Sequence, residues 1–143
     1  MKKNIQEIKQ FNRFYVRMMG LLSLYNDKSP YSATEAMILF QIHATENCTA
    51  SFLSEYYLFD KGYISRIIKK FERKGLIEKI PSTEDRRLQY LVMTEKGEKE
   101  LHDLEKNADK SVEKMIAGIS EEDIGVVIQS MKQIESALQK NDE

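Results

Sequence analysis

Basic side chains recur at helical spacing between residues 61 and 74. The spacing i, i+3, i+4 and i+7, which marks one buried helix face, is met by Ile64, Ile67, Ile68 and Phe71. With that face turned inward, the outward side chains are Lys61, Tyr63, Ser65, Arg66, Lys69, Lys70 and Arg73. An Arg can bond guanine bidentately, and Ser or Tyr can bond base edges or phosphates. This face therefore predicts contact with double-stranded DNA through a helix in the major groove.

The first turn of such a helix reaches deepest into the groove, and this divides the predicted roles. Base-edge contacts are expected from Lys61, Tyr63, Ser65 and Arg66. Phosphate contacts are expected from Lys69, Lys70, Arg73 and Lys74. Gly62 leaves room for close approach of the backbone. A solvated helix face is the alternative for any run of charges, and the neighbouring elements decide between the two.

A second basic group follows at Asp85, Arg86 and Arg87, within the polar stretch 82–87. An Arg at the tip of a hairpin can enter a narrow minor groove, where the negative potential is enhanced, and a nearby Asp can hold its guanidinium. These residues alone would be ordinary turn charges. Their place after a basic helix favours contact with DNA by Arg86 or Arg87.

Two helices are expected in the part of the chain before residue 49. Apolar steps of three and four between Ile5 and Tyr25 predict an amphipathic helix that ends by residues 27–30. Ser32 and Glu35 form a capping box, because each side chain can bond a free backbone N–H of the other residue. A second helix is therefore predicted to begin after Ser32.

Two further caps predict a helix-turn-helix. Thr49 can cap a short third helix, and after a turn of a few residues Asp60 can cap the helix over 61–74. Gly75 can adopt the positive φ that ends it. A short capped helix, a tight turn and a second helix with one apolar face form this motif.

A hairpin and two more helices complete the expected order. β-prone residues on both sides of the stretch 82–87 predict two short strands, the wing of a winged helix. Helical spacing then resumes after Thr94 and continues to Ile119, and Ser120 with Asp123 starts a last helix. The fold class predicted is mainly α with a small β-hairpin wing, in which a winged helix-turn-helix core is flanked by N- and C-terminal dimerisation helices.

The overall charge conceals an uneven distribution. The 143 residues carry 22 basic and 23 acidic side chains, a formal net charge of −1. Residues 61–94 hold nine basic and four acidic groups, whereas residues 95–143 hold seven and thirteen. A field acts on a partner through its local distribution, so the middle segment can bind phosphate although the whole chain is almost neutral.

Composition and motifs exclude several other classes. One Cys in 143 residues provides no disulfide framework and points to a reducing compartment, and charges recur too often for a signal peptide or a bilayer-crossing run. A cytoplasmic protein without contact to membranes is expected. No phosphate-binding loop or nucleophile motif occurs, so no enzyme is predicted. His43, Cys48 and His102 lack ligand spacing, so neither a metal site nor a cofactor is predicted.

The two chain ends carry apolar stripes that lie outside the winged core. Burial of these stripes between two copies of the chain would give a homodimer, and an intramolecular helix pair is an equally open alternative. The residues assigned to dimerisation are Ile5, Ile8, Phe11, Ile124, Ile128, Met131 and Ile134.

Several Met and aromatic residues have two interpretations. Met18, Tyr25, Tyr31 and Phe40 could line a pocket for a small-molecule effector between the end helices and the core, with His43 as a contact. Core packing is the alternative, because Met and aromatic residues at helical spacing usually pack inside. Oxidant sensing by Cys48 is a weaker hypothesis, since no cation adjoins it in the sequence to lower the pKa of the thiol.

From about Ser32 to Leu101 the sequence resembles the MarR family of winged helix-turn-helix regulators. The residues that carry the resemblance are Leu53 with Ser54 and Glu55, Asp60 with Lys61, Ser65 with Arg66, the run 71–77, and Asp85, Arg86 and Arg87 followed by Leu91, Thr94, Glu95, Lys96 and Gly97. The wing leading into Leu-x-x-Thr-x-x-Gly is the most specific part. Two residues depart from the pattern: Leu58 stands where the family often has a turn Gly, and Ser54 where Ala is usual.

The resemblance implies a fold and a function for the whole chain. Members of this family are homodimers with interleaved terminal helices that bind pseudo-palindromic operators and often release them on binding a small molecule or an oxidant. Residues 1–143 are then expected to form one domain, with its winged core at 31–97 and its dimerisation helices at 1–30 and 98–143. The expected function is a ligand-responsive repressor, and the alternative is a winged helix that docks a protein without binding DNA.

Overall fold

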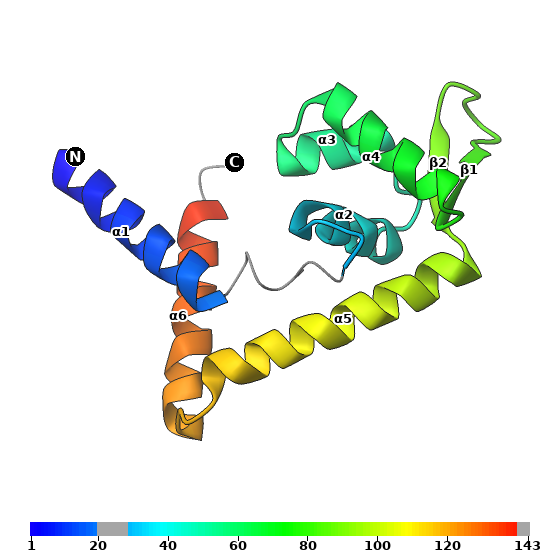
Figure 1. Ribbon diagram of the computed structural model, residues 1–143. Coiled ribbons are helices and arrows are strands. Elements are labelled where there is room, and N and C mark those ends of the chain that lie inside the picture. Colours follow the sequence, from blue (N-terminus) through cyan, green and yellow to red (C-terminus); the bar gives the residue numbers. More distant parts are fainter. Residues whose placement is uncertain (20–28, 140–143) are drawn as a thin grey trace.

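Figure 1 shows the computed structural model, which describes residues 1–19 and 29–139. Within these residues six helices and one antiparallel hairpin follow in the predicted order. Their bounds are α1 Lys2–Met19, α2 Ala33–Ala44, α3 Ala50–Tyr57, α4 Lys61–Arg73, β1 Ile77–Pro81, β2 Gln89–Met93, α5 Glu95–Ile116 and α6 Glu121–Gln139. The prediction of a mainly α fold with a hairpin wing is confirmed.

The predicted helix caps are confirmed. The Ser32 hydroxyl accepts a hydrogen bond from the Glu35 N–H at 3.1 Å, and the Glu35 carboxylate accepts one from the Ser32 N–H at 2.9 Å. Asp60 accepts from the N–H groups of Gly62 and Tyr63 at the start of α4. Since these bonds satisfy orphan N–H groups, the local sequence sets where α2 and α4 begin.

One predicted helix end differs from the structure. The helical spacing predicted α5 as far as Ile119, but α5 ends at Ile116 because Ala117 is extended and Gly118 has a φ of +82°. The predicted continuation of the first helix beyond Met19, which includes Tyr25, lies outside the described residues.

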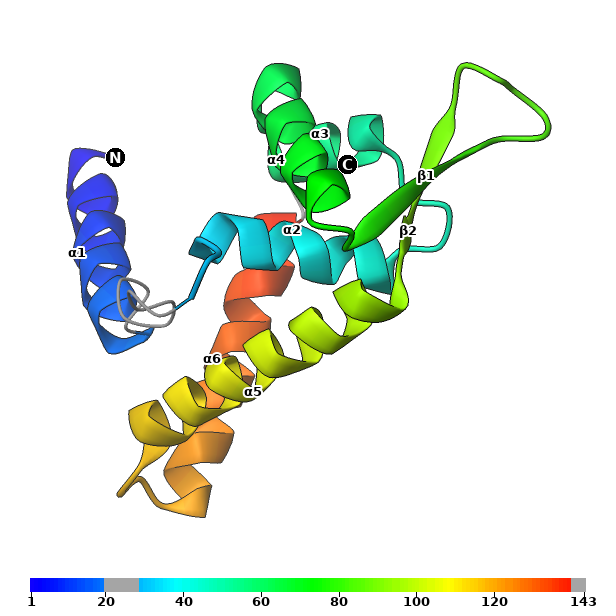
Figure 2. The same cartoon turned by 45° about the vertical axis from the view of Figure 1, so that its right-hand side comes forward.

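The hairpin is joined to the helices by one additional backbone pairing. Ile77 pairs with Met93 at one end of the hairpin and Pro81 pairs with Gln89 at the other. The Leu91 N–H donates to the Cys48 carbonyl at 2.8 Å, so the segment before α3 forms a bridge with β2. In both views the wing projects at the end of the molecule opposite α1 and α6 (Figures 1 and 2).

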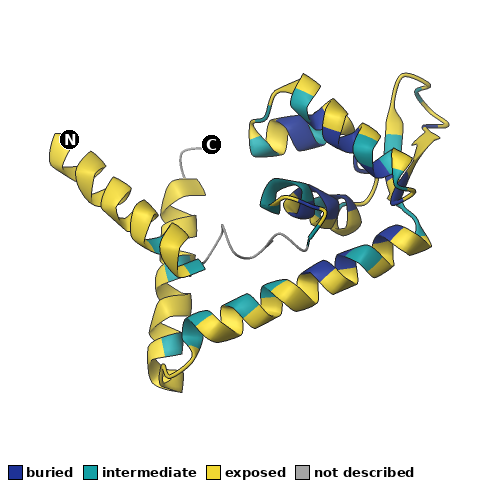
Figure 3. Cartoon of the chain, in the orientation of Figure 1, coloured by how far each residue is buried: buried dark blue, intermediate teal, exposed yellow. Residues whose placement is uncertain are grey.

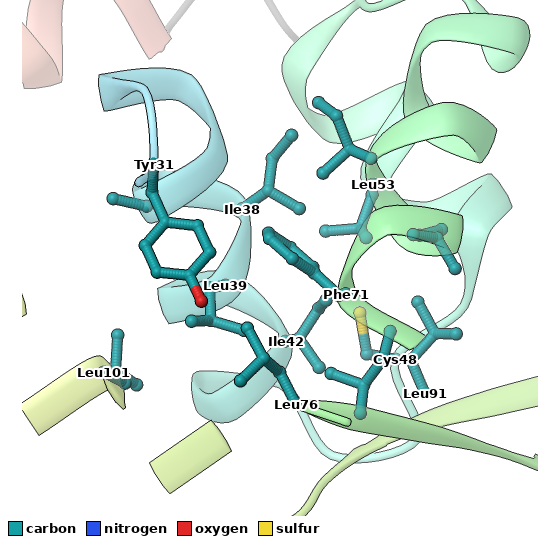
Figure 4. Packing of buried hydrophobic residues seen from close by; sticks show 14 of the residues in the cluster. Tyr31, Ile38, Leu39, Ile42, Cys48, Leu53, Phe71, Leu76, Leu91 and Leu101 are labelled. Carbon is teal, nitrogen blue, oxygen red and sulfur yellow. The ribbon is translucent and has the colours of Figure 1, made fainter. Parts of the chain in front are cut away.

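The core lies between α2, α3, α4 and β2. Phe71 of α4 is fully buried at its centre, with Ile38 on one side and Leu53 on the other (Figure 4). The four α4 residues predicted to face inward are all buried: Ile64, Ile67, Ile68 and Phe71. Leu101 and Leu104 extend this cluster onto α5, whereas α1 and α6 contain no buried residue (Figure 3).

The turn between α3 and α4 explains the two residues that depart from the family pattern. Leu58 has a φ of +56° and its side chain is 90% exposed. Ser54 is buried, and its hydroxyl donates to the Phe59 carbonyl at 2.6 Å while its own carbonyl accepts from the Phe59 N–H at 3.1 Å. The Ser54 bonds thus hold a turn whose left-handed residue is not glycine.

We expect Leu58→Gly to stabilise the protein. A left-handed conformation costs a non-glycine residue about 1–2 kcal/mol, part of which is offset by the greater freedom of glycine in the unfolded chain. The free energy of unfolding in urea should therefore rise by about 0.5–1 kcal/mol. Leu58→Ala removes the same exposed side chain but keeps the strained backbone, so an equal gain in this control would contradict the explanation.

Cys48 is a core residue of this fold. Its side chain is fully buried, and burial raises the pKa of the thiol to about 11. Keeping the thiol protonated contributes stability that is fully present below its ordinary pKa of 9.0 and is lost as the pH rises through about 11. At neutral pH the residue is an inert packing group, which argues against oxidant sensing by this side chain.

We expect the Cys48 thiol to react with a small aromatic disulfide at pH 8 at least about 100-fold more slowly in the native protein than in urea, because reaction requires opening of the core. The rate can be followed by absorbance, with Cys48→Ala as the blank. A native rate equal to the unfolded rate would restore the sensing hypothesis.

Candidate nucleic-acid interface

The solvent face of α4 carries an open hollow of about 570 Å³ lined by Arg66, Lys69, Glu72 and Arg73. Arg66, Lys69 and Arg73 are exposed, whereas Glu72 is half-buried and pairs with Lys79 of β1 at 3.2 Å. The carboxylate on this face is therefore compensated from the wing. The three exposed cations lie together, which is the arrangement predicted for a face that contacts phosphate and base edges.

The first turn of α4 is held by Asp60 and is open to solvent. Lys61 and Ser65 are both exposed. A Cβ added to Gly62 would lie 3.0 Å from the Asp60 carboxylate and 3.5 Å from a guanidinium nitrogen of Arg66. The Arg66 head group therefore lies back over the start of the helix, where base contacts were predicted.

Lys70 is placed differently from the prediction that it grips phosphate beside Lys69. Its ammonium pairs with the Glu35 carboxylate at 2.8 Å and donates to the Pro30 carbonyl at 3.3 Å. It also lies 5.6 Å from the centre of the Tyr31 ring. Helical spacing within α4 could not predict this contact, because its partner Glu35 belongs to α2.

The environment of Glu35 keeps this pair ionised. Burial pushes the pKa of the Glu35 carboxyl up, but the hydrogen bonds from Lys70 and Ser32 outweigh burial and hold it below its ordinary value. A carboxyl with a lowered pKa contributes stability above its ordinary pKa and loses it as the pH falls through the folded value. At neutral pH Lys70 thus connects α4 to the start of α2.

Tyr63 was predicted to contact base edges, but its side chain is not freely exposed. Its side chain is half-buried, and its ring packs edge-on against Phe59 at 5.4 Å between centres. The ring of Phe59 in turn stacks on Tyr57 at 5.7 Å. Tyr63 is therefore part of the packing that supports the turn between α3 and α4.

The wing tip is held by Asp85, as predicted. The Asp85 carboxylate accepts from the Arg87 N–H at 3.0 Å and from the Arg87 Nε at 3.3 Å. The Arg87 side chain is 92% exposed, and Arg86 is exposed as well. A guanidinium that is held at its base and free at its tip can enter a groove of DNA without first being ordered.

Sequence reasoning missed Ser82 as the organiser of this tip. Ser82 is buried, and its hydroxyl accepts from the N–H groups of Glu84 and Asp85, both at 3.2 Å. The Ser82 N–H donates to the Leu88 carbonyl at 2.9 Å, which closes the loop. The signal was a Ser at the start of a polar stretch, where its hydroxyl can accept from the backbone N–H groups two and three residues later, as in a serine turn.

The residues assigned to an effector pocket are spread over different environments. Tyr31 is buried in the core, Met18 and Phe40 are 41% and 45% exposed, and Tyr25 lies outside the described residues. His43 is exposed and its Nδ1 lies 3.0 Å from the Glu98 carboxylate of α5. His43 therefore joins two helices at the surface.

The seven residues assigned to dimerisation are exposed or half-buried on α1 and α6.

Among the described helices none is long and apolar enough to cross a membrane. Within the described residues no group of three or more His, Cys, Asp or Glu side chains could hold a metal ion.

Comparison with known proteins identifies this winged core. Residues 31–88 match the model of the MarR family. The transcriptional regulator BilQ of Clostridioides difficile (strain CD3) is 34% identical over 85 residues, a match that spans 57% of this chain and 57% of BilQ, so just over half of that relative is covered.

Two solved structures match nearly the whole chain. The first is Streptococcus pneumoniae FabT in complex with DNA, with a TM-score of 0.73, 26% identity and coverage of 98% of this chain and 99% of FabT. The second is a MarR family protein from Bacillus stearothermophilus, with a TM-score of 0.81, 13% identity and coverage of 97% and 98%. The family model covers residues 31–88, and the chain as a whole shares the winged-helix fold of these structures, so it is similar to proteins of the MarR family.

Proposed function

We propose that this protein is a homodimeric, sequence-specific transcriptional regulator that places α4 in the major groove of double-stranded DNA and Arg87 in the adjacent minor groove. The observation that carries the proposal is the set of exposed cations on one helix that is anchored by its opposite face, Arg66, Lys69 and Arg73. The relatives support it, because BilQ is named a transcriptional regulator and FabT was solved with DNA. A winged helix that docks a protein remains the alternative, and the basic face favours DNA.

The contacts divide by position. Lys61, Ser65 and Arg66 meet base edges, while Lys69 and Arg73 contact phosphates. Lys70 and Tyr63 support α4 from behind through Glu35 and Phe59. Specificity then resides in the first turn of α4 and affinity in its later turns.

A second copy of the chain is the partner that the terminal helices require. Neither α1 nor α6 contains a buried residue, and their apolar side chains include Ile8, Val126 and Leu138, which are 60%, 59% and 65% exposed. Pairing these stripes with a second copy buries them, and a two-fold axis would place two α4 helices about 34 Å apart on a pseudo-palindromic operator. Residues 1–30 and 98–143 are the dimerisation segments, and 31–97 the winged core.

The regulator is proposed to act as a repressor that a small molecule releases. The exposed apolar side chains of Met37 and Phe40 on α2, at 41% and 45%, supply a surface for such an effector beside the dimerisation helices. Effector binding there would act on the spacing of the two α4 helices.

The DNA contacts predict a specific response to substitution. On a labelled duplex from the protein's own upstream region, Arg66→Ala and Arg87→Ala should each weaken binding by about 1–3 kcal/mol per half-site. Lys69→Ala should weaken binding to the specific and to a scrambled duplex equally, and should reduce the slope of log K against log salt by about one per half-site. Fluorescence anisotropy at several salt concentrations measures both.

Lys110→Ala is the matched control, since it removes one exposed cation of α5, distant from the wing. Its affinity should equal that of the unchanged protein. Binding with no sequence preference and no salt dependence would contradict the proposal. An unchanged affinity of Arg87→Ala for the duplex would refute the role of the wing.

The dimer predicts an effect of charge on α6. Ile128 is 48% exposed in one chain, so Ile128→Glu should change the stability of an isolated chain by no more than about 0.5 kcal/mol. Between two copies it would bury a carboxylate without a partner, so sedimentation should show a species near the 16.7 kDa of one chain in place of a dimer. Gln129→Glu adds the same charge at the next position, where no apolar side chain is lost, and should remain dimeric. A stable dimer of Ile128→Glu would contradict this assignment of α6.

A further inference from the structure

Three consecutive carbonyls directly after α4 are bonded by Thr94 and Lys96, at the start of α5. The Lys96 ammonium donates to the Lys74 carbonyl at 2.8 Å, and the Thr94 hydroxyl donates to the Gly75 carbonyl at 2.6 Å. The Thr94 N–H donates to the Leu76 carbonyl at 3.0 Å. We call these three bonds the carbonyl clasp. They satisfy backbone carbonyls of the link between α4 and β1, which no helix or strand bond would otherwise pair.

Gly97 brings the two backbones together at the same place. It is buried, and a Cβ added to it would overlap the Leu76 carbonyl oxygen and lie 3.2 Å from the Leu76 Cα. The Gly97 N–H donates to the Thr94 hydroxyl at 3.0 Å, so this hydroxyl both caps α5 and holds Gly75. Backbone packs on backbone here, and no flexible side chain separates the two elements.

The clasp leaves little freedom between α4 and α5. The carbonyl end of a helix carries partial negative charge, which strengthens a bond from an ammonium such as that of Lys96. From this point α5 continues for 22 residues, about 33 Å at 1.5 Å per residue, to its far end beside α6 (Figure 2). A small change of angle at the clasp therefore becomes a large displacement at the proposed dimer interface.

We propose that Thr94, Lys96 and Gly97 are positioning residues that fix the angle between α4 and α5 and so set the half-site spacing that the dimer reads. The proposal rests on the proposed function, because spacing has meaning only for a dimer on DNA. None of the three needs to touch DNA for this role. A rigid clasp excludes operators of the wrong spacing, while a loosened one lets α4 adapt to them.

The test compares variants on duplexes whose two half-sites, taken from a footprint of the unchanged protein, are separated by the native spacing or by one extra base pair. Lys96→Met should lower the preference for the native spacing about five-fold, the equivalent of one hydrogen bond, with an unchanged salt slope. Thr94→Val should act likewise, and Thr94→Ser, which keeps the hydroxyl, should preserve the preference. Lys99→Met, which removes the neighbouring cation on α5, should also preserve it.

A second readout without DNA tests the clasp separately from the proposed function. In Lys96→Met the backbone amide of Thr94 should exchange its hydrogen about five-fold faster, and in Lys99→Met at the original rate. A reduced salt slope with intact spacing preference would make Lys96 a phosphate contact and overturn the clasp. Unchanged spacing preference and exchange in both Lys96→Met and Thr94→Val would overturn it too, whereas failure of the unchanged protein to bind any duplex would refute the proposed function alone.

Discussion

Burial of one stripe of α4 is the interaction on which the rest of the molecule depends. Phe71, Ile64 and Ile68 are almost fully buried, and they belong to the same helix that exposes Arg66, Lys69 and Arg73. Since each turn of a helix fixes both faces at once, the packing of Phe71 also fixes the direction of the cations. Rigidity in the core thus becomes preorganisation at the surface, where ordering several long cationic side chains during binding would otherwise cost free energy.

Ion pairing then selects which cations are available to a partner. Lys70 is committed to Glu35, and Lys79 compensates Glu72 beside the hollow. Partly exposed pairs contribute little to stability, with a median of about 0–1 kcal/mol, so their main effect here is on charge distribution. They remove one lysine from the free cations of α4 and compensate the Glu72 carboxylate, which would repel a phosphate.

Local sequence predicted what depends on local bonds, and tertiary contacts decided the rest. Ser32, Thr49, Asp60 and Gly75 could be assigned because caps and a left-handed end require particular residues within one turn. Helical spacing also separated buried from exposed positions on α4. It could not reveal that Lys70 meets a carboxylate 35 residues earlier in the chain, or that His43 meets Glu98, because sequence spacing carries no information on contacts between elements.

The near-zero net charge of the chain makes local geometry decisive for the proposed discrimination between DNA sequences. A net charge of −1, with thirteen acidic side chains in residues 95–143, provides little long-range attraction to a polyanion. Under the proposed function, affinity for DNA must then come from the few cations on α4 and the wing, whose contacts weaken steeply with small displacements. A long α5 extends most of that acidic segment away from the wing (Figure 1), and Thr94 at its start donates to the carbonyls of Gly75 and Leu76 directly after α4. In the proposed dimer on DNA, the same element would keep these carboxylates away from phosphate and would link the orientation of α4 to the dimer interface.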